Sequence, residues 1–224
     1  MSMEDNADIL MLEQIAYELR KSVLEMIFLA GSGHPGGSLS LCEILSVLYY
    51  NELNVDPSNP KDPTRDRLIF SKGHGAPALY AVLARKGYFP EHHVKTLRKI
   101  GSILQGHPDS TKTPGVEISS GSLGMGLSFG IGTALAAKHD RLPYRTYVIV
   151  GCGELDEGQN WEGFLTAAKY KLDNFVVIVD YNKVQLDGTN EEILPLSDLS
   201  AKLRGFNMNV MECDGHDVSA IINT

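Results

Sequence analysis

Apolar residues near the start of the chain recur every three or four positions, which is the spacing of one face of a helix. The set consists of Ile9, Leu12, Ile15, Leu19, Val23 and Ile27. This pattern predicts a long amphipathic helix over residues 8–30, which the glycines and proline of residues 31–37 then break. Shorter apolar stretches predict further helices over residues 41–51, 77–86 and 124–139.

The pattern changes in the second half of the chain, where apolar residues become consecutive. Such runs are typical of parallel strands that helices cover on both faces. The expected strands cover residues 67–71, 146–150, 175–180 and 208–211, and the expected later helices cover 158–171, 197–204 and the residues from 217 onward. The alternation predicts an α/β fold, a doubly wound and mostly parallel sheet with helices on both faces.

Composition and charge narrow the kinds of partner. The chain has 224 residues, 43% of them hydrophobic, which suits one globular domain over residues 1–224. Its formal net charge of -8 would repel nucleic acid and an anionic membrane, whereas a small phosphorylated ligand senses only its own pocket.

Features that would direct the chain out of the cytoplasm are not found in the sequence. The first residues are polar and acidic, and no apolar run approaches the roughly 20 residues that span a bilayer. The cysteines, Cys42, Cys152 and Cys213, are far apart and have neither zinc nor disulfide spacing. We therefore expect a cytoplasmic protein.

The clearest chemical signal is a strand, a Gly-X-Gly turn, a helix and a second strand that ends in Asp-Tyr-Asn. It runs from Gly151 to Val184. Ligands of open parallel sheets bind at the carboxyl ends of the strands. Glycines let a diphosphate approach the backbone, and a helix N-terminus favours its charge. The segment therefore predicts a diphosphate and metal site.

Several motifs together resemble the N-terminal, thiamine-diphosphate-binding domain of the transketolase family. They are SGHPGGSLS (32–40), SKGHGAPALY (71–80), GHPD (106–109), TPGVEISSGSLGMGLS (113–128) and GELDEGQNWEG (153–163). Their order and spacing agree with the family from about residue 9 to the end. The resemblance implies the fold of the diphosphate domain and transfer of a two-carbon ketol unit between sugar phosphates, as in the pentose phosphate pathway.

The resemblance also implies roles for individual residues. Asn182 and the carbonyl of Val184 resemble the metal ligands, and His74 and Gly153 would contact the diphosphate. The cofactor's thiazole and aminopyrimidine would be lined by Gly121, Ser122 and Leu123. His34 and His107 would face the substrate, with His74 beside them. Glu157 resembles a carboxylate that links the two cofactor sites of a dimer.

Two features depart from the family. Cys152 stands where the family has an aspartate, and a thiol suits Mg²⁺, Ca²⁺ or Mn²⁺ less well than a carboxylate does. We therefore expect weakened metal binding or a softer metal. The resemblance also ends soon after residues 214–217, without the family's later histidine and its pyrimidine-binding domain. This implies a partner, a C-terminal transketolase subunit that carries that domain, in a homodimer or heterotetramer.

Other interpretations remain open. Taken singly, His34, His74 and His107 are ordinary turn or buried histidines, and only their membership in one motif set favours a site. Cys152 and the short end are also compatible with a non-catalytic interaction module. A related thiamine-dependent synthase, such as deoxyxylulose-phosphate synthase, is a third possibility, although that family is usually one long chain.

Overall fold

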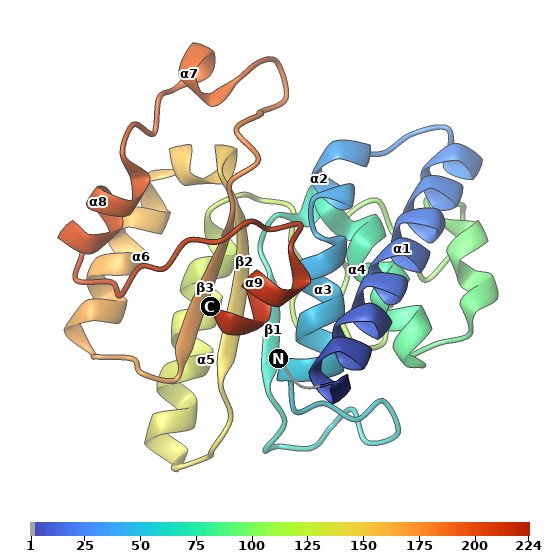
Figure 1. Cartoon of the computed structure of the whole chain (residues 1–224), viewed down its shortest axis with the longest axis horizontal. Coiled ribbons are helices and arrows are strands. Elements are labelled where there is room, and N and C mark those ends of the chain that lie inside the picture. The colour runs from blue at the N-terminus through green and yellow to red at the C-terminus, as the bar shows by residue number, and fades with distance from the viewer. Residues whose placement is uncertain (1–2) are drawn as a thin grey trace. The chain divides into compact units, whose positions relative to one another are not determined.

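A computed structural model describes residues 3–224, with side chains from residue 8 onward. The chain divides into two compact units. The helical unit contains residues up to 62, 74–119 and 212–224, and the sheet unit contains residues 63–73 and 120–211. The elements of both units are drawn in Figure 1.

The helical unit is organised by α1, Met3–Ala30, which confirms the long helix predicted from the apolar spacing. Leu12, Leu19 and Val23 are buried along one face, where α1 packs against α3, Cys42–Val47, and α4, Ala76–Lys86. Burial of this face drives the packing, at roughly 1.5–3 kcal/mol for each large apolar side chain. Gly31, at φ +64°, ends α1, and Pro35–Leu39 forms the short helix α2.

The later elements of the helical unit return to the first helices. A 3-10 helix, Glu91–Thr96, packs on α1 and α4. At the end of the chain, α9, Val218–Asn223, begins after Asp217, whose side chain accepts a hydrogen bond from the backbone of Ala220. Val218 packs against Leu12 of α1 and Val47 of α3. This position confirms the helix predicted from residue 217 onward.

The sheet unit contains three parallel strands in the order β1-β2-β3 among the described residues. Their bounds are Arg67–Phe70 for β1, Thr146–Gly151 for β2 and Phe175–Asp180 for β3. Helix α5, Met125–Asp140, lies against all three strands, and α6, Gly158–Lys169, packs on α5. The expected α/β fold with a parallel sheet is confirmed.

Close packing of α5 on the sheet depends on glycine. A Cβ at Gly130 would collide with the side chain of Val148 in β2, and a Cβ at Gly126 would collide with Ser71 beyond β1. Both positions lie on the helix face that meets the sheet. The glycines that the sequence places in this helix therefore set the distance between the two layers.

Three expectations need correction. Residues 208–211 form no strand, because the segment after α8, Leu199–Gly205, has no ladder of hydrogen bonds to a neighbour. The run 175–179 in β3 is only half-buried, because helix α5 contacts β3 less than it contacts β1 and β2. The helix expected over 41–51 changes after α3 into a wider π-helical turn, Leu48–Glu52, which the bond from Leu53 N to Leu48 O closes.

Within residues 3–224, no helix is both long enough and apolar enough to cross a membrane.

Candidate functional site

The register of the sheet brings three loops to one edge. Gly151 at the end of β2 pairs with Asp180 at the end of β3, and Cys152 N donates to the Asp180 carbonyl at 3.1 Å. On the other side, Ser71 N donates to the carbonyl of Ile149 at 2.9 Å. Because the strands are parallel, the segments that follow each of them emerge together at the carboxyl edge of the sheet.

The three predicted metal ligands meet at this edge. Cys152 Sγ lies 3.4 Å from Asn182 Oδ1 and 3.9 Å from the carbonyl oxygen of Val184. A fourth residue, Asn190, also points at the sulfur, with its Oδ1 at 3.5 Å. The thiol is buried, and Asn182 Oδ1 also accepts a hydrogen bond from Val184 N at 3.1 Å.

Sequence reasoning missed Asn190. It is the first residue of the short helix α7, Asn190–Ile193, which a capping box between Thr189 and Glu192 initiates. That Thr-x-x-Glu spacing is visible in the sequence and predicts a helix start at this point. It does not predict that the first side chain of the helix turns back toward residue 152.

The chemistry of this donor set fits a divalent cation only in part. Asn and carbonyl oxygens are ligands that Mg²⁺ and Ca²⁺ accept, but sulfur is a soft donor that those ions do not prefer. Within the described residues, no group of three or more His, Cys, Asp or Glu side chains is arranged to hold a metal. A cation at Cys152 would therefore depend on amide and carbonyl oxygens together with the sulfur.

Glu154 is a second buried group at this edge, and it was assigned no role from the sequence. Its side chain accepts hydrogen bonds from the hydroxyl of Ser71, from Gly124 N at 2.9 Å and from Gly151 N at 3.1 Å. Burial raises the pKa of Glu154, and the three donors partly oppose that rise. The carboxyl group thus joins the ends of β1 and β2 to the loop that precedes α5.

An ion pair crosses the same edge. Lys72 Nζ lies 2.5 Å from Asp180 Oδ2, and the two side chains are 1% and 7% exposed. Lys72 follows β1 and Asp180 ends β3, with β2 between them. The pair therefore fixes the two outer strands relative to each other at the point where the loops emerge.

The loop of residues 121–124, whose first three residues are expected to line the thiazole and aminopyrimidine, is held by backbone packing. A Cβ at Gly73 would lie 2.7 Å from the backbone nitrogen of Gly121, so only glycine permits this approach. In the same loop, Ser122 is exposed, Leu123 is half-buried and Gly124 adopts a left-handed φ of +83°. Neither Ser122 nor Leu123 is enclosed by the sheet unit.

The remaining predicted residues of the sheet unit lie around the start of α6. Gly153 begins a 3-10 helix that ends at Asp156, and a Cβ added to it would lie 3.0 Å from the side chain of Gln185. Glu157 is exposed and occupies the N-cap position of α6. One turn further along, Trp161 Nε1 donates to the carbonyl of Leu155 at 2.8 Å.

The three predicted histidines all belong to the helical unit. The rings of His34 and His74 meet edge to face, with centroids 5.5 Å apart. Partial burial lowers the pKa of His107, and the positive charges of Arg98 and His34 lower it further. The histidine group and the Cys152 group are thus carried by different units of the chain.

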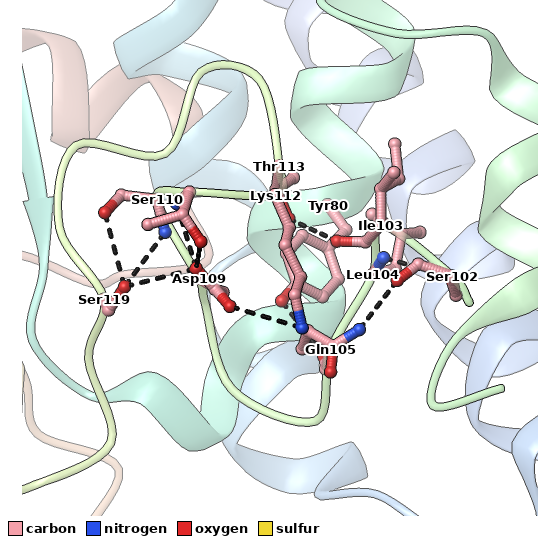
Figure 2. A network of polar contacts seen from close by, with 11 residues as sticks. Tyr80, Ser102, Ile103, Leu104, Gln105, Asp109, Ser110, Lys112, Thr113 and Ser119 are labelled. Atoms are coloured by element: carbon pink, nitrogen blue, oxygen red, sulfur yellow. Dashed lines mark hydrogen bonds and ion pairs between the residues drawn. The ribbon is translucent and has the colours of Figure 1, made fainter. Parts of the chain in front are cut away.

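A network of hydrogen bonds shapes the loop that carries His107 (Figure 2). The hydroxyl of Tyr80 in α4 donates to the carbonyl of Gln105 at 3.0 Å, and Thr113 Oγ1 donates to the carbonyl of Ile103 at 2.5 Å. After the histidine, Asp109 Oδ1 accepts from the backbone and hydroxyl of Thr111. The backbone on both sides of His107 is therefore fixed by side chains.

Comparison with known proteins agrees with this architecture. Residues 12–224 match the family model described as transketolase, thiamine diphosphate binding domain. A 6-deoxy-6-sulfo-D-fructose transketolase subunit from Clostridium sp. (strain MSTE9) is 48% identical over 95% of this chain and 77% of its own length. An apulose-4-phosphate transketolase subunit from Phocaeicola vulgatus is 42% identical over 92% of this chain and 73% of its own length.

A solved structure of a transketolase also matches this chain. The crystal structure of transketolase from Campylobacter jejuni aligns with a TM-score of 0.91 and 34% identity, over 96% of this chain and 35% of that chain. This chain therefore spans about a third of the length of that transketolase. The relatives define the class as thiamine-diphosphate-dependent transferases of the transketolase type. More particularly, the chain belongs to the family of transketolase thiamine diphosphate-binding domains.

Proposed function

We propose that this chain is the N-terminal subunit of a two-chain, transketolase-like enzyme that transfers a two-carbon ketol unit between sugar phosphates. The observation that carries the proposal is the carboxyl edge of the sheet. There the Gly-X-Gly turn at Cys152 meets the oxygens of Asn182 and Val184. The relatives from Clostridium and Phocaeicola are themselves subunits, and this chain covers 77% and 73% of their lengths.

The residues of the sheet unit suit the binding half of this task. In our proposal, Asn182 and Val184 hold the metal and Gly153 accommodates the diphosphate, while residues 121–123 line the thiazole and aminopyrimidine. Thiamine diphosphate supplies the means to stabilise the transferred two-carbon unit when it is bound. The protein's contribution at this edge is a rigid frame, which Glu154 and the pair of Lys72 and Asp180 provide.

The histidines of the helical unit suit proton transfer and hydroxyl recognition. Because its pKa lies below that of an ordinary histidine, His107 is neutral near pH 7 and is able to accept a proton at a ring nitrogen. We assign the substrate-facing roles to His34 and His107, and contact with the diphosphate to His74. Arg98 supports the neutral form of His107 through its charge.

A partner chain completes the proposal. It would carry the pyrimidine-binding domain and the glutamate that activates the cofactor, within a homodimer or a heterotetramer. Glu157, exposed at the start of α6, is the residue of this chain that we assign to the link between two cofactor sites. The proposal leaves the individual sugar open, because one related subunit is named for a sulfonated deoxyfructose and the other for a phosphorylated apulose.

The decisive experiment uses the purified chain, alone and mixed with a candidate pyrimidine-domain subunit, at saturating thiamine diphosphate and divalent metal. We expect no ketol transfer by the chain alone and transfer in the mixture. Robust turnover by the chain alone would refute the two-chain proposal. Stable association without any transfer would instead support a non-catalytic interaction module, which the thiol at Cys152 favours.

A further inference from the structure

A hollow of about 590 Å³ opens on the helical unit, beside the segment that precedes His107. Its eight lining residues come from residues 98–105, together with Lys112. Three of them, Arg98, Lys99 and Lys112, are cations, and none is acidic. This composition is unusual in a chain that has 28 acidic and 20 basic residues. The hollow is therefore a positively charged site on a protein of negative net charge.

Two of these cations have no partner of opposite charge within the chain. Lys112 Nζ lies 3.7 Å from Asp109 Oδ2 in a partly exposed pair. Arg98 and Lys99 form no ion pair with any other residue that the structure describes. Cations that gather in a concave site raise the local concentration of anions there. An anionic ligand is therefore the species that would complete this hollow.

The loop around the hollow is held in one conformation by its own side chains. The hydroxyls of Thr96 and Ser102 lie 2.7 Å apart, and Ser102 Oγ accepts a hydrogen bond from Leu104 N at 3.0 Å. Gln105 Nε2 donates to the carbonyl of Ser102 at 2.7 Å (Figure 2). Arg98 has a left-handed φ of +60°, and its backbone N donates to the Leu104 carbonyl at 2.9 Å. A strained backbone that surrounding contacts maintain is typical of ligand-binding sites.

Arg98 connects the hollow to His107. A Cβ added to Gly106 would lie 3.2 Å from Arg98 Nε, so the arginine side chain passes beside the residue that precedes the histidine. The positive charge of Arg98 also lowers the pKa of His107, which requires the two groups to be near each other. The side chain of His107 is exposed. A ligand held in the hollow would therefore lie next to this histidine.

We propose that the hollow binds the phosphate group of the sugar phosphate, with Arg98, Lys99 and Lys112 as its cationic residues. The inference rests on the proposed function and names the part of the substrate that this chain holds. A phosphate group carries a charge of about -1.5 to -2 at pH 7 and three strong acceptor oxygens, which suits three cations around one hollow. The sugar carbons extend from there toward His107, so the same contacts position the substrate.

Binding is tested on the full chain alone by NMR titration. The probes are inorganic phosphate, a pentose 5-phosphate and the unphosphorylated pentose, with sodium chloride adjusted to keep the ionic strength constant. We expect both phosphates to shift the amide signals of residues 98–105 in a saturable way, and the pentose to leave them unchanged. Shifts that chloride reproduces would overturn the proposal. So would binding of inorganic phosphate for which the pentose 5-phosphate does not compete.

Lys99 and Lys112 are the residues to replace, because the loss of Arg98 would also change the titration of the histidine beside it. Lys99→Gln/Lys112→Gln should weaken the binding of both phosphates about tenfold, with each single variant responsible for roughly threefold. Lys95→Gln is the matched control, because Lys95 lines a second hollow of the same unit and its Nζ lies 3.5 Å from the carboxylate of Glu25. It should leave phosphate binding unchanged. An equal loss in this control would show that only the net charge matters, and the proposal would be wrong.

Activity with the partner subunit separates this inference from the proposed function. In the mixture, Lys99→Gln/Lys112→Gln should raise the KM of a phosphorylated aldose about tenfold at unchanged kcat, and should leave the KM of an unphosphorylated aldose as it was. If the mixture transfers ketol units and the double variant changes neither KM, the function stands and the phosphate site fails. If the full chain binds both phosphates as expected but no partner confers activity, the phosphate site stands and the function fails.

Discussion

The ammonium group of Lys72 lies 2.5 Å from the carboxylate of Asp180, and these two buried charges connect the outer strands of the sheet. A buried pair of this kind contributes little net stability compared with apolar residues. Removing either member, however, leaves the other as a buried charge without compensation. Asp180 also precedes Asn182 by two residues in the chain. The integrity of the pair therefore affects both the sheet and the loop that carries a predicted metal ligand.

Replacing one member of this pair should be more harmful than replacing both. Lys72→Met leaves the buried Asp180 carboxylate without its ammonium partner, and we expect a loss of about 3–5 kcal/mol in the free energy of unfolding, measured in urea. The double variant Lys72→Met/Asp180→Leu should recover most of that loss. The control is Lys138→Met, whose partner Asp173 is 84% exposed, and solvent screening should make its effect much smaller. If the double variant lost as much unfolding free energy as the two single variants together, the two charges would not compensate each other and the interpretation would be wrong.

Glu154→Gln should destabilise the carboxyl edge of the sheet. The amide can still accept hydrogen bonds through its oxygen, but its NH₂ must face one of the donors, Gly124 N or Gly151 N. We expect a loss of about 1–3 kcal/mol in unfolding free energy and weaker thiamine diphosphate binding by calorimetry. Asp66→Asn is the matched control, because Asp66 accepts a bond from Arg145 N at the opposite end of the sheet. It should lower stability without lowering cofactor affinity.

The same carboxyl group predicts a pH dependence. Its folded pKa lies above the ordinary value of 4.5, so the folded chain binds more protons than the unfolded chain between the two pKa values. The contribution of Glu154 to stability is therefore full below pH 4.5 and is lost as the pH rises through the folded pKa. Subtracting the stability of Glu154→Gln from that of the unaltered chain at each pH should give a falling curve. A difference in stability that rises with pH would mean that the hydrogen-bond donors lower the pKa of Glu154 by more than burial raises it.

His107 should titrate below pH 6.5 in the folded chain. Arg98→Gln should raise its pKa only part of the way back, because burial is the larger cause of the shift. Between the two pKa values the folded chain binds fewer protons, so the histidine's contribution to stability increases with pH there. Histidine ring signals followed by NMR measure the pKa, and Lys99→Gln is the neighbouring control. An unchanged pKa in Arg98→Gln would exclude the electrostatic contribution.

Tyr80→Phe should loosen the loop that carries His107. It removes the hydroxyl that donates to the Gln105 carbonyl (Figure 2), at a cost of about 0.5–1.5 kcal/mol. Tyr144→Phe is matched, since the Tyr144 hydroxyl donates to the Thr133 carbonyl at the same distance of 3.0 Å. Both variants should lose similar stability. Only Tyr80→Phe should increase amide hydrogen exchange over residues 103–107, and equal exchange in the two would refute the positioning role.

The fold was largely predictable because its strongest patterns are local. The spacing in α1 and the consecutive apolar residues of β2 and β3 each predict an element from its own sequence. Residues 208–211 were predicted wrongly because a strand also needs a neighbour at the correct register, and a single segment carries no information on that. The half-buried state of β3 follows from the smaller contact that α5 makes with it, which is likewise a property of the tertiary packing and not of the segment alone.

The site was predictable where a motif places residues in order along the chain. Cys152, Asn182 and Val184 follow strand ends, and parallel pairing brings such positions together. Asn190 and Glu154 were missed because their contacts come from distant segments: Glu154 receives hydrogen bonds from residues 83 and 30 positions earlier in the chain. Only the folded arrangement reveals that these polar groups share one edge.

The indole of Trp161 gives the chain an optical property. It is the only tryptophan in the sequence, and its ring N–H donates a hydrogen bond to the carbonyl of Leu155, one residue beyond Glu154. Indole emission depends on the polarity and rigidity around the ring. Movement of residues 153–156 when a ligand occupies the sheet edge should therefore change the intrinsic fluorescence of the unlabelled chain, and rapid mixing would resolve how quickly that movement occurs.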